Sequence, residues 1–302
     1  MSNSRDTNRK AINNQIDISI SGSVKKYMAY RQWPGSTGFP VIMLHGWLDN
    51  SESFSMLMET TAMQNSSIEF VAIDFPGHGD SFTRPPGENL HFIDNVADIL
   101  AFTQAMGWDK FYIVGHSMGA ALGSLVAAAY PEKVLGFVSI EAMGPMSTDS
   151  KDAVKQLRQH LHYRLKKPGS MPRYPSIEKA LEARMEKGGA NKHAMRAMVK
   201  RNLSEDDGEY RWKTDQRLRH PTAIRMSPQH THAVLKEISG KMMTIWGDKG
   251  FKKLYPEMSS RGDEFTEIKQ VVLPGGHHLH MENPDQVAEV IVQYLQHSSD
   301  QE

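Results

Sequence analysis

The stretch FYIVGHSMGAALG, residues 111–123, decides the fold of this chain. An apolar run of strand-forming residues ends in Gly115, His116 and Ser117, and after Gly119 the chain continues with small residues typical of a closely packed helix. This is the G-x-S-x-G pattern in a strand–turn–helix context, where the serine occupies a tight, strained turn. A side chain at either glycine would collide with the folded backbone, and the helix that follows directs its free N–H groups toward a developing anion. The pattern predicts that Ser117 is a nucleophile.

Strands and helices are expected to alternate on both sides of this segment, because short apolar runs alternate with apolar residues spaced by three and four. The expected strands are residues 16–22, 25–33, 40–46, 68–77, 110–115, 134–144, 241–247 and 267–276, and the expected helices are 51–63, 90–108, 117–133, 227–240 and 283–297. The first two strands are typical of a hairpin with a glycine-containing turn. Nearly continuous apolar strands that alternate with helices favour a parallel sheet covered on both faces.

The alternation is interrupted between residues 145 and 226, where the chain is polar and helical in pattern. This segment carries 19 Lys and Arg against 10 Asp and Glu, whereas the remainder carries 16 against 25. We therefore expect an α/β domain formed by residues 17–144 and 227–302, a helical cap inserted at 145–226, and a polar segment at 1–16. The basic charge is typical of a solvated helical surface; it would also suit anionic substrates or a partner docking on that face.

The overall composition excludes several classes of protein. Of 302 residues, 39% are hydrophobic and 23% charged, with 35 Lys and Arg balancing 35 Asp and Glu, so nothing indicates a nucleic-acid partner. The absence of cysteine excludes disulfides, thiolate catalysis and cysteine-ligated metals. The polar start lacks a signal-peptide core and no run approaches the length of a membrane span, so we expect a cytoplasmic protein with no membrane insertion.

A serine nucleophile needs a base, and the candidates lie in LPGGHHLHMENP, residues 273–284. His277 follows a double glycine directly, which gives it freedom to reach the serine, and His278 is the alternative. The spacing of His277, His278 and His280 also permits a metal site. No acidic ligands at suitable spacing accompany them, so metal binding is disfavoured.

The acid that orients the base has two candidates. Glu141 lies at the end of the strand after the serine helix, and Asp248 directly follows the strand at 241–247. Both positions are at the carboxyl edge of a parallel sheet, so either carboxylate could reach the histidine. A further polar group, Asp74 with His78 and Asp80 in DFPGHGDS, is typical of a tight turn whose side chains satisfy backbone groups.

Four motifs in order, LHGW, DFPGHGDS, GHSMG and PGGHHLHMENP, together resemble the α/β-hydrolase fold superfamily over residues 17–297, and within it the serine-hydrolase-like members. The resemblance implies a mostly parallel eight-stranded sheet with helices on both faces and an inserted helical cap. It also implies an oxyanion hole made by the backbone N–H groups of Met118, after the nucleophile, and Trp47, just past His45. His45 is then expected to support this loop.

The resemblance also bears on the acid. Superfamily members commonly place it three residues past a glycine, in the pattern G-x-x-D, but three residues past Gly247 this chain has Gly250. Relatives that carry the acid at the end of the earlier strand, such as some haloalkane dehalogenases, have a segment similar to IEAMGP at 140–145. This comparison favours Glu141 over Asp248.

The sequence thus predicts a serine hydrolase that cleaves a carboxylic ester or related acyl compound, a small-molecule substrate, through an acyl-enzyme intermediate. No cofactor or metal is required, and a monomer or homodimer is expected. Two alternatives use the same motifs: hydrolysis of a C–C bond, or ligand sensing with weak turnover. The cap is expected to cover the pocket, with candidate apolar lining residues Met143, Met146, Tyr163, Tyr174 and Trp212.

Overall fold

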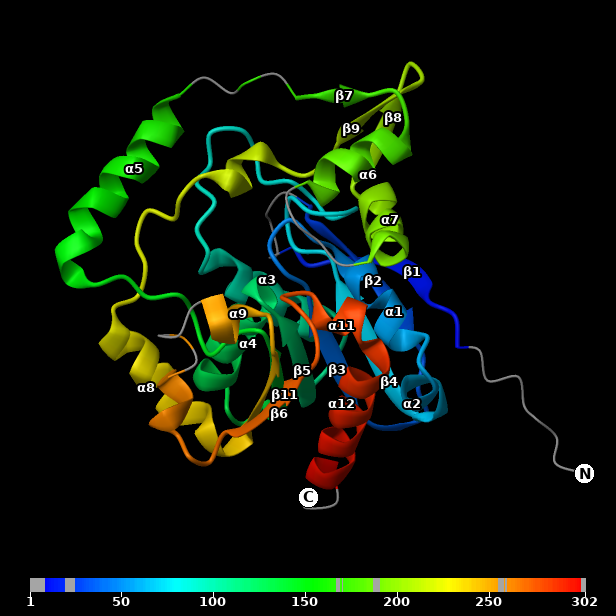
Figure 1. Ribbon diagram of the computed structural model, residues 1–302, viewed down its shortest axis with the longest axis vertical. Coiled ribbons are helices and arrows are strands. Elements are labelled where there is room, and N and C mark those ends of the chain that lie inside the picture. The colour runs from blue at the N-terminus through cyan, green and yellow to red at the C-terminus, as the bar shows by residue number, and fades with distance from the viewer. Residues whose placement is uncertain are drawn as a thin grey trace, which may run out of the picture.

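The computed structural model describes residues 9–19, 25–166, 169, 171–186, 191–254, 258 and 260–299. Its centre is an eight-stranded sheet in the order β1-β2-β4-β3-β5-β6-β10-β11 (Figure 1). The strands are β1 (Ile12–Asp17), β2 (Tyr27–Trp33), β3 (Thr37–Leu44), β4 (Ile68–Ile73), β5 (Phe111–His116), β6 (Val134–Ile140), β10 (Met242–Gly247) and β11 (Lys269–Leu273). Only β2 runs antiparallel to its neighbours, and every other pairing is parallel. The predicted mostly parallel eight-stranded sheet is confirmed.

Helices cover both faces of this sheet, as predicted. On one face α4 contacts β5 and β6 and also packs against α3 and α8; on the other, α12 contacts α1, α2 and β6. The bounds of these helices are α1 (Ser55–Met58), α2 (Thr61–Asn65), α3 (Asp94–Ala105), α4 (Met118–Ala129), α8 (Pro228–Ile238) and α12 (Pro284–Ser299), and two short helices, α9 (Phe251–Leu254) and α11 (Leu279–Glu282), lie near the site.

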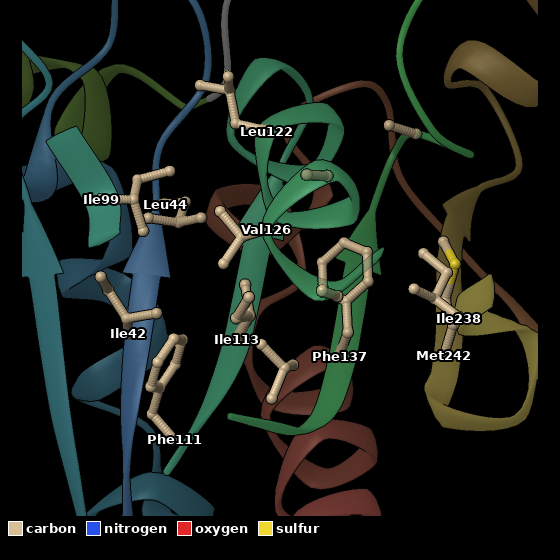
Figure 2. Packing of buried hydrophobic residues seen from close by; sticks show 14 of the residues in the cluster. Ile42, Leu44, Ile99, Phe111, Ile113, Leu122, Val126, Phe137, Ile238 and Met242 are labelled. Carbon is tan, nitrogen blue, oxygen red and sulfur yellow. The ribbon is translucent and has the colours of Figure 1, made fainter. Parts of the chain in front are cut away.

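The core between α4 and the sheet depends on close approach of the backbones. Figure 2 shows Val126 of α4 above Ile113 and Phe137 of the sheet, all fully buried. A Cβ at Gly123 would lie 3.0 Å from atoms of both Ile113 and Phe137, so the helix sits as near as a glycine permits. The run of small residues in α4 therefore sets the distance between helix and sheet, which positions the turn that precedes the helix.

The N-terminal strand differs from its prediction. β1 covers Ile12–Asp17 and pairs with β2, whereas we expected a strand at 16–22 preceded by a polar segment through residue 16. The expected turn at 20–24 lies outside the described residues. The strand is at the edge of the sheet and exposes alternate residues, so its sequence needs few apolar side chains and gives a weak signal.

The helix predicted at 51–63 is also interrupted. It consists of a 3₁₀ turn at Ser51–Phe54, then α1, and then α2 after a break at residues 59–60. The hydroxyl of Thr60 accepts a hydrogen bond from the amide of Met63 and caps α2. A threonine that caps a new helix competes with continuation of the old one, which the apolar spacing alone does not reveal.

The segment between β6 and β10 is not wholly helical, contrary to prediction. It contains α5 (Ala153–Leu165), α6 (Ile177–Met185) and α7 (Lys192–Arg201), and also a small sheet of β7 (Arg173–Tyr174), β8 (Leu203–Asp206) and β9 (Glu209–Trp212) in the order β7-β9-β8. The β8–β9 hairpin turns at Asp207 and Gly208, both with positive φ (52° and 76°). An Asp-Gly pair is a strong hairpin signal, and here it interrupts the helical pattern expected for residues 145–226.

None of the helices among the described residues is both long and apolar enough to cross a membrane.

Candidate active site

The turn between β5 and α4 holds Ser117 in a strained backbone conformation, with φ of 52° and ψ of −112°. A Cβ at Gly115 would lie 2.6 Å from Cα of Ala120, and one at Gly119 would lie 2.7 Å from the carbonyl oxygen of His45. Both glycines are therefore required by contact with backbone, for the reason the sequence suggested. The strain is stored at the one residue whose hydroxyl must project from the sheet edge.

Three predicted residues meet at this turn. The Nε2 atom of His277 lies 3.0 Å from Oγ of Ser117, and its Nδ1 atom lies 3.1 Å from Oε2 of Glu141. The ring of Phe251 stacks on the imidazole, with centroids 3.7 Å apart and planes 15° apart. The carboxylate accepts from Nδ1–H, which leaves the lone pair of Nε2 to accept the serine proton. The result is a continuous acid–imidazole–hydroxyl chain.

Glu141 follows β6 directly and is fully buried, with a positive φ of 60°. Its Oε1 accepts a hydrogen bond of 2.6 Å from the amide of Gly247, and its Oε2 accepts one of 2.5 Å from the amide of Phe251. Burial raises the pKa of Glu141, and these two amide donors oppose that rise. With the histidine, three N–H groups point at the carboxyl group, an arrangement that favours the ionised form.

Asp248 does not contact the histidine. Its Oδ1 accepts a hydrogen bond of 2.9 Å from the amide of Gly275, so it holds the loop that leads to His277. Gly250, where the family pattern would place the acid, is against Glu141: a Cβ there would lie 2.5 Å from the carboxyl carbon and nearer still to both oxygens. A side chain at position 250 and the Glu141 carboxylate would compete for the same space.

His278 faces a different carboxylate. Its Nε2 atom lies 3.4 Å from Oδ2 of Asp49, and Nε2–H of His116 donates a 2.8 Å hydrogen bond to the carbonyl of His277. Burial alone would raise the pKa of Asp49, but the neighbouring His278 and His116 and the guanidinium of Arg184 in α6 lower it well below its usual range. The sequence did not single out Asp49, although it follows the expected oxyanion segment by two residues.

The resting state of His277 suits a base. Burial, helped by the adjacent His278, lowers the pKa of His277 to about 3. The imidazole is therefore neutral at neutral pH, and Nε2 can accept a proton from the serine 3.0 Å away.

The two predicted oxyanion donors are the backbone N–H groups of Met118 and Trp47. Met118 is the first residue of α4, and Trp47 lies in the loop after β3; within the described part of the chain, neither backbone N–H donates to a protein acceptor. The indole of Trp47 is half exposed and donates a 2.9 Å hydrogen bond to the carbonyl of Leu218, in the segment inserted between β6 and β10. The side chain thus ties this loop to the insertion and leaves its amide free.

Two buried histidines hold the same loop. The Nε2 atom of His78 accepts from the amide of Leu48 at 3.2 Å, where Leu48 has a positive φ of 62°. His45 donates from Nδ1 to the carbonyl of Gly46 at 2.7 Å and accepts from the amide of Phe75 at 3.0 Å. Burial lowers the pKa of His78 to about 3, so it remains a neutral acceptor. These contacts assign the histidine of DFPGHGDS to support of the backbone, in line with the sequence interpretation.

The two aspartates of DFPGHGDS, Asp74 and Asp80, bind the segment inserted between β6 and β10. The guanidinium of Arg201, at the end of α7, contacts Oδ2 of buried Asp74 at 2.8 Å and Oδ2 of Asp80 at 3.2 Å. The adjacent Asn202 accepts from the amide of Gly79 at 3.1 Å. The turn therefore anchors α7 to the main sheet.

The predicted lining residues are mostly packing residues. Met143 belongs to the main core, and Tyr174 and Trp212 pack against the apolar cluster of α6 and α7. Met146 and Tyr163 are about half exposed, at 46% and 45%, and Tyr163 packs against the ring of His220. Among the described residues, no group of three or more His, Asp or Glu is arranged to hold a metal ion.

Comparison with known proteins agrees with this architecture. The profile of the family described as "alpha/beta hydrolase fold" matches residues 40–189. A serine hydrolase-like protein of Danio rerio is 31% identical over 88% of this chain and 84% of its own, and one of Dictyostelium discoideum is 29% identical over 93% and 82%. A crystal structure of a hypothetical protein from Pseudomonas aeruginosa superposes with a TM-score of 0.84 at 31% identity, over 93% of this chain and 99% of that one.

Proposed function

Because the chain belongs to the α/β hydrolase fold family and its relatives include serine hydrolase-like proteins, we propose that this hydrolase cleaves carboxylic esters or related acyl compounds. The proposal depends above all on one observation, the 3.0 Å separation of Ser117 Oγ and His277 Nε2. A hydroxyl that shares its proton with a neutral, oriented imidazole is an activated nucleophile for acyl transfer.

In the first half-reaction, Ser117 Oγ forms a bond to the carbonyl carbon while its proton moves to Nε2 of His277. Glu141, 3.1 Å from Nδ1, stabilises the imidazolium that results. The carbonyl oxygen gains a negative charge and is met by the amides of Trp47 and Met118; each such donor is worth about 3 kcal/mol in acyl transfer. The imidazolium then returns the proton to the leaving oxygen as the ester bond breaks.

In the second half-reaction, a water molecule gives its proton to the same Nε2 atom and attacks the acyl-enzyme. The imidazolium of His277 then reprotonates Ser117, and the carboxylic acid is released. The buried His277 suits both halves, because a lowered pKa keeps its resting form neutral.

The test is covalent labelling combined with turnover. A fluorophosphonate probe is expected to label one serine, and Ser117→Ala is expected to abolish both labelling and hydrolysis of a p-nitrophenyl ester series. Ser150→Ala serves as the matched control, since Ser150 is exposed and remote in sequence from the elbow. Labelling that persists in Ser117→Ala, or wild-type activity in that variant, would contradict the proposal. Turnover of a vinylogous diketone without ester cleavage would assign C–C bond hydrolysis instead.

A further inference from the structure

Helix α5 (Ala153–Leu165) contacts the rest of the protein through its polar side. Gln156 and His160 donate hydrogen bonds of 2.8 Å each to backbone carbonyls of residues 221–222, and Arg164 donates to carbonyls of another loop. These three residues are spaced by four, and together they form a row along one side of the helix. They are the only half-buried residues of α5, and none of its residues is buried.

The apolar row of α5 lies next to this polar row and remains exposed. Val154, Leu157, Leu161 and Leu165 are 70%, 43%, 47% and 84% exposed. At 100° per residue they fall within an arc of about 80°, the pattern by which a surface helix normally faces a core. With Arg158 and His162 they line a shallow open groove. The apolar row of α5 is thus left exposed, whereas an ordinary surface helix buries such a row against a core.

Cations border the apolar row. Arg158 lies between Val154 and Leu161 at spacings of four and three, Lys155 lies further round the helix, and both cations are exposed. The whole segment 145–226 carries 19 Lys and Arg against 10 Asp and Glu. A helix with an apolar stripe, a basic border and low overall hydrophobicity is typical of one that lies in the plane of a membrane interface. We propose that α5 docks this hydrolase on an anionic lipid surface, with the leucine row among the acyl chains and the basic side chains against the headgroups.

Two further observations favour a lipid surface over a second copy of the chain. The exposed large apolar residues outside α5 lie on separate elements in the described part of the chain, for example Ile12 on β1, Phe39 on β3 and Val272 on β11, so no matching apolar groove is offered. Pairing of α5 with α5 would bring two basic segments together at a cost that an anionic bilayer does not impose. The helix lies at the periphery of the molecule, where a flat surface can reach it (Figure 1).

The experiment is flotation of the full chain with vesicles of phosphatidylcholine alone or of phosphatidylcholine with phosphatidylglycerol. We expect binding to the anionic vesicles that weakens as salt is raised. Arg158→Glu is expected to weaken that binding about thirtyfold, because each cation near such a surface contributes about fivefold and the change amounts to two charges. Lys192→Glu, at an exposed position on α7, is the matched control and should bind nearly as the parent does.

The variant Leu157→Ser/Leu161→Ser separates lipid docking from charge alone. It should lose anionic vesicle binding and keep the parent rate on a soluble short-chain ester, which also shows that it is folded. No binding of the parent chain to anionic vesicles would overturn the proposal. Unchanged binding of the leucine variant to anionic vesicles would also overturn it. A parent dimer in sedimentation equilibrium that dissociates in the leucine variant would do the same, because α5 would then be an interface between two copies of the chain.

Discussion

Replacing Gly250 by alanine tests whether Glu141 orients the base. The φ of Gly250 is outside the left-handed region, so alanine fits the backbone itself. The three atoms nearest to the new Cβ all belong to the Glu141 carboxyl group, whose carbon would lie 2.5 Å away. Real Cβ atoms do not approach that closely, so the carboxylate must move.

The expected loss of activity in Gly250→Ala follows from the contacts that the Glu141 carboxylate would lose. Displacement breaks its hydrogen bonds from Gly247 at 2.6 Å and Phe251 at 2.5 Å, and its contact with Nδ1 of His277 at 3.1 Å. Loss of the acid's orienting role costs about 10⁴ in kcat in a serine protease triad. A displaced carboxylate keeps part of its charge effect, so we expect kcat/KM to fall by about 10² to 10⁴, or roughly 3 to 5 kcal/mol of transition-state stabilisation.

The assay is hydrolysis of p-nitrophenyl acetate, with thermal unfolding as a check on the fold. Gly240→Ala is the control, because a Cβ there has no atom within 4 Å. In Glu141→Gly/Gly250→Asp the new carboxylate occupies the vacated space, and we expect at least part of the lost rate to return. A folded Gly250→Ala enzyme with the parent rate would refute the assignment of Glu141.

Other predictions follow from the remaining contacts. Glu141→Gln should lower kcat at least about 100-fold, whereas Asp248→Asn should lower kcat only slightly, since only the first change removes an oriented acid. The reverse result would reassign the acid. His78→Phe should lower kcat about 10- to 100-fold with KM nearly unchanged, because the Leu48 amide loses its 3.2 Å acceptor; an unchanged kcat would contradict the support role. Arg201→Ala should lower the free energy of unfolding in urea by about 3 kcal/mol, since buried Asp74 loses its partner at 2.8 Å, while Arg196→Ala, an exposed pair, should change little. Burial lowers the pKa values of six described histidines (His45, His78, His116, His220, His277 and His280), so the unfolded chain binds more protons below about pH 6.5. Stability should therefore be fully present above that pH and fall as the pH drops, by up to about 1.4 kcal/mol per pH unit for each histidine, and a urea midpoint that is flat from pH 7 to 5 would contradict this.

The parts of the fold that the sequence predicted well have local causes. Buried parallel strands such as β5 contain an apolar run, here residues 111–114, and α4 is recognisable from its small residues. The parts that it missed have weak local signals: β1 is an edge strand with alternate exposed residues, and the β8–β9 hairpin depends on a single Asp-Gly pair. Edge strands and short hairpins need few apolar residues, so periodicity alone does not detect them.

By itself, the sequence singled out Ser117 as the candidate nucleophile. A side chain at Gly115 would clash with the backbone a few residues after Ser117, and one at Gly119 would clash with the backbone at the end of β3. The G-x-S-x-G pattern therefore follows from steric contacts close to the serine. Only the tertiary structure shows which candidate acid and base lie together. Glu141 and Asp248 both follow parallel strands and His277 and His278 are consecutive, so the sequence favoured Glu141 and His277 but left both alternatives open. The pairing of β6 with β10 brings the Glu141 carboxyl group onto the amides of Gly247 and Phe251, and such contacts between segments more than 100 residues apart exist only once the sheet has formed.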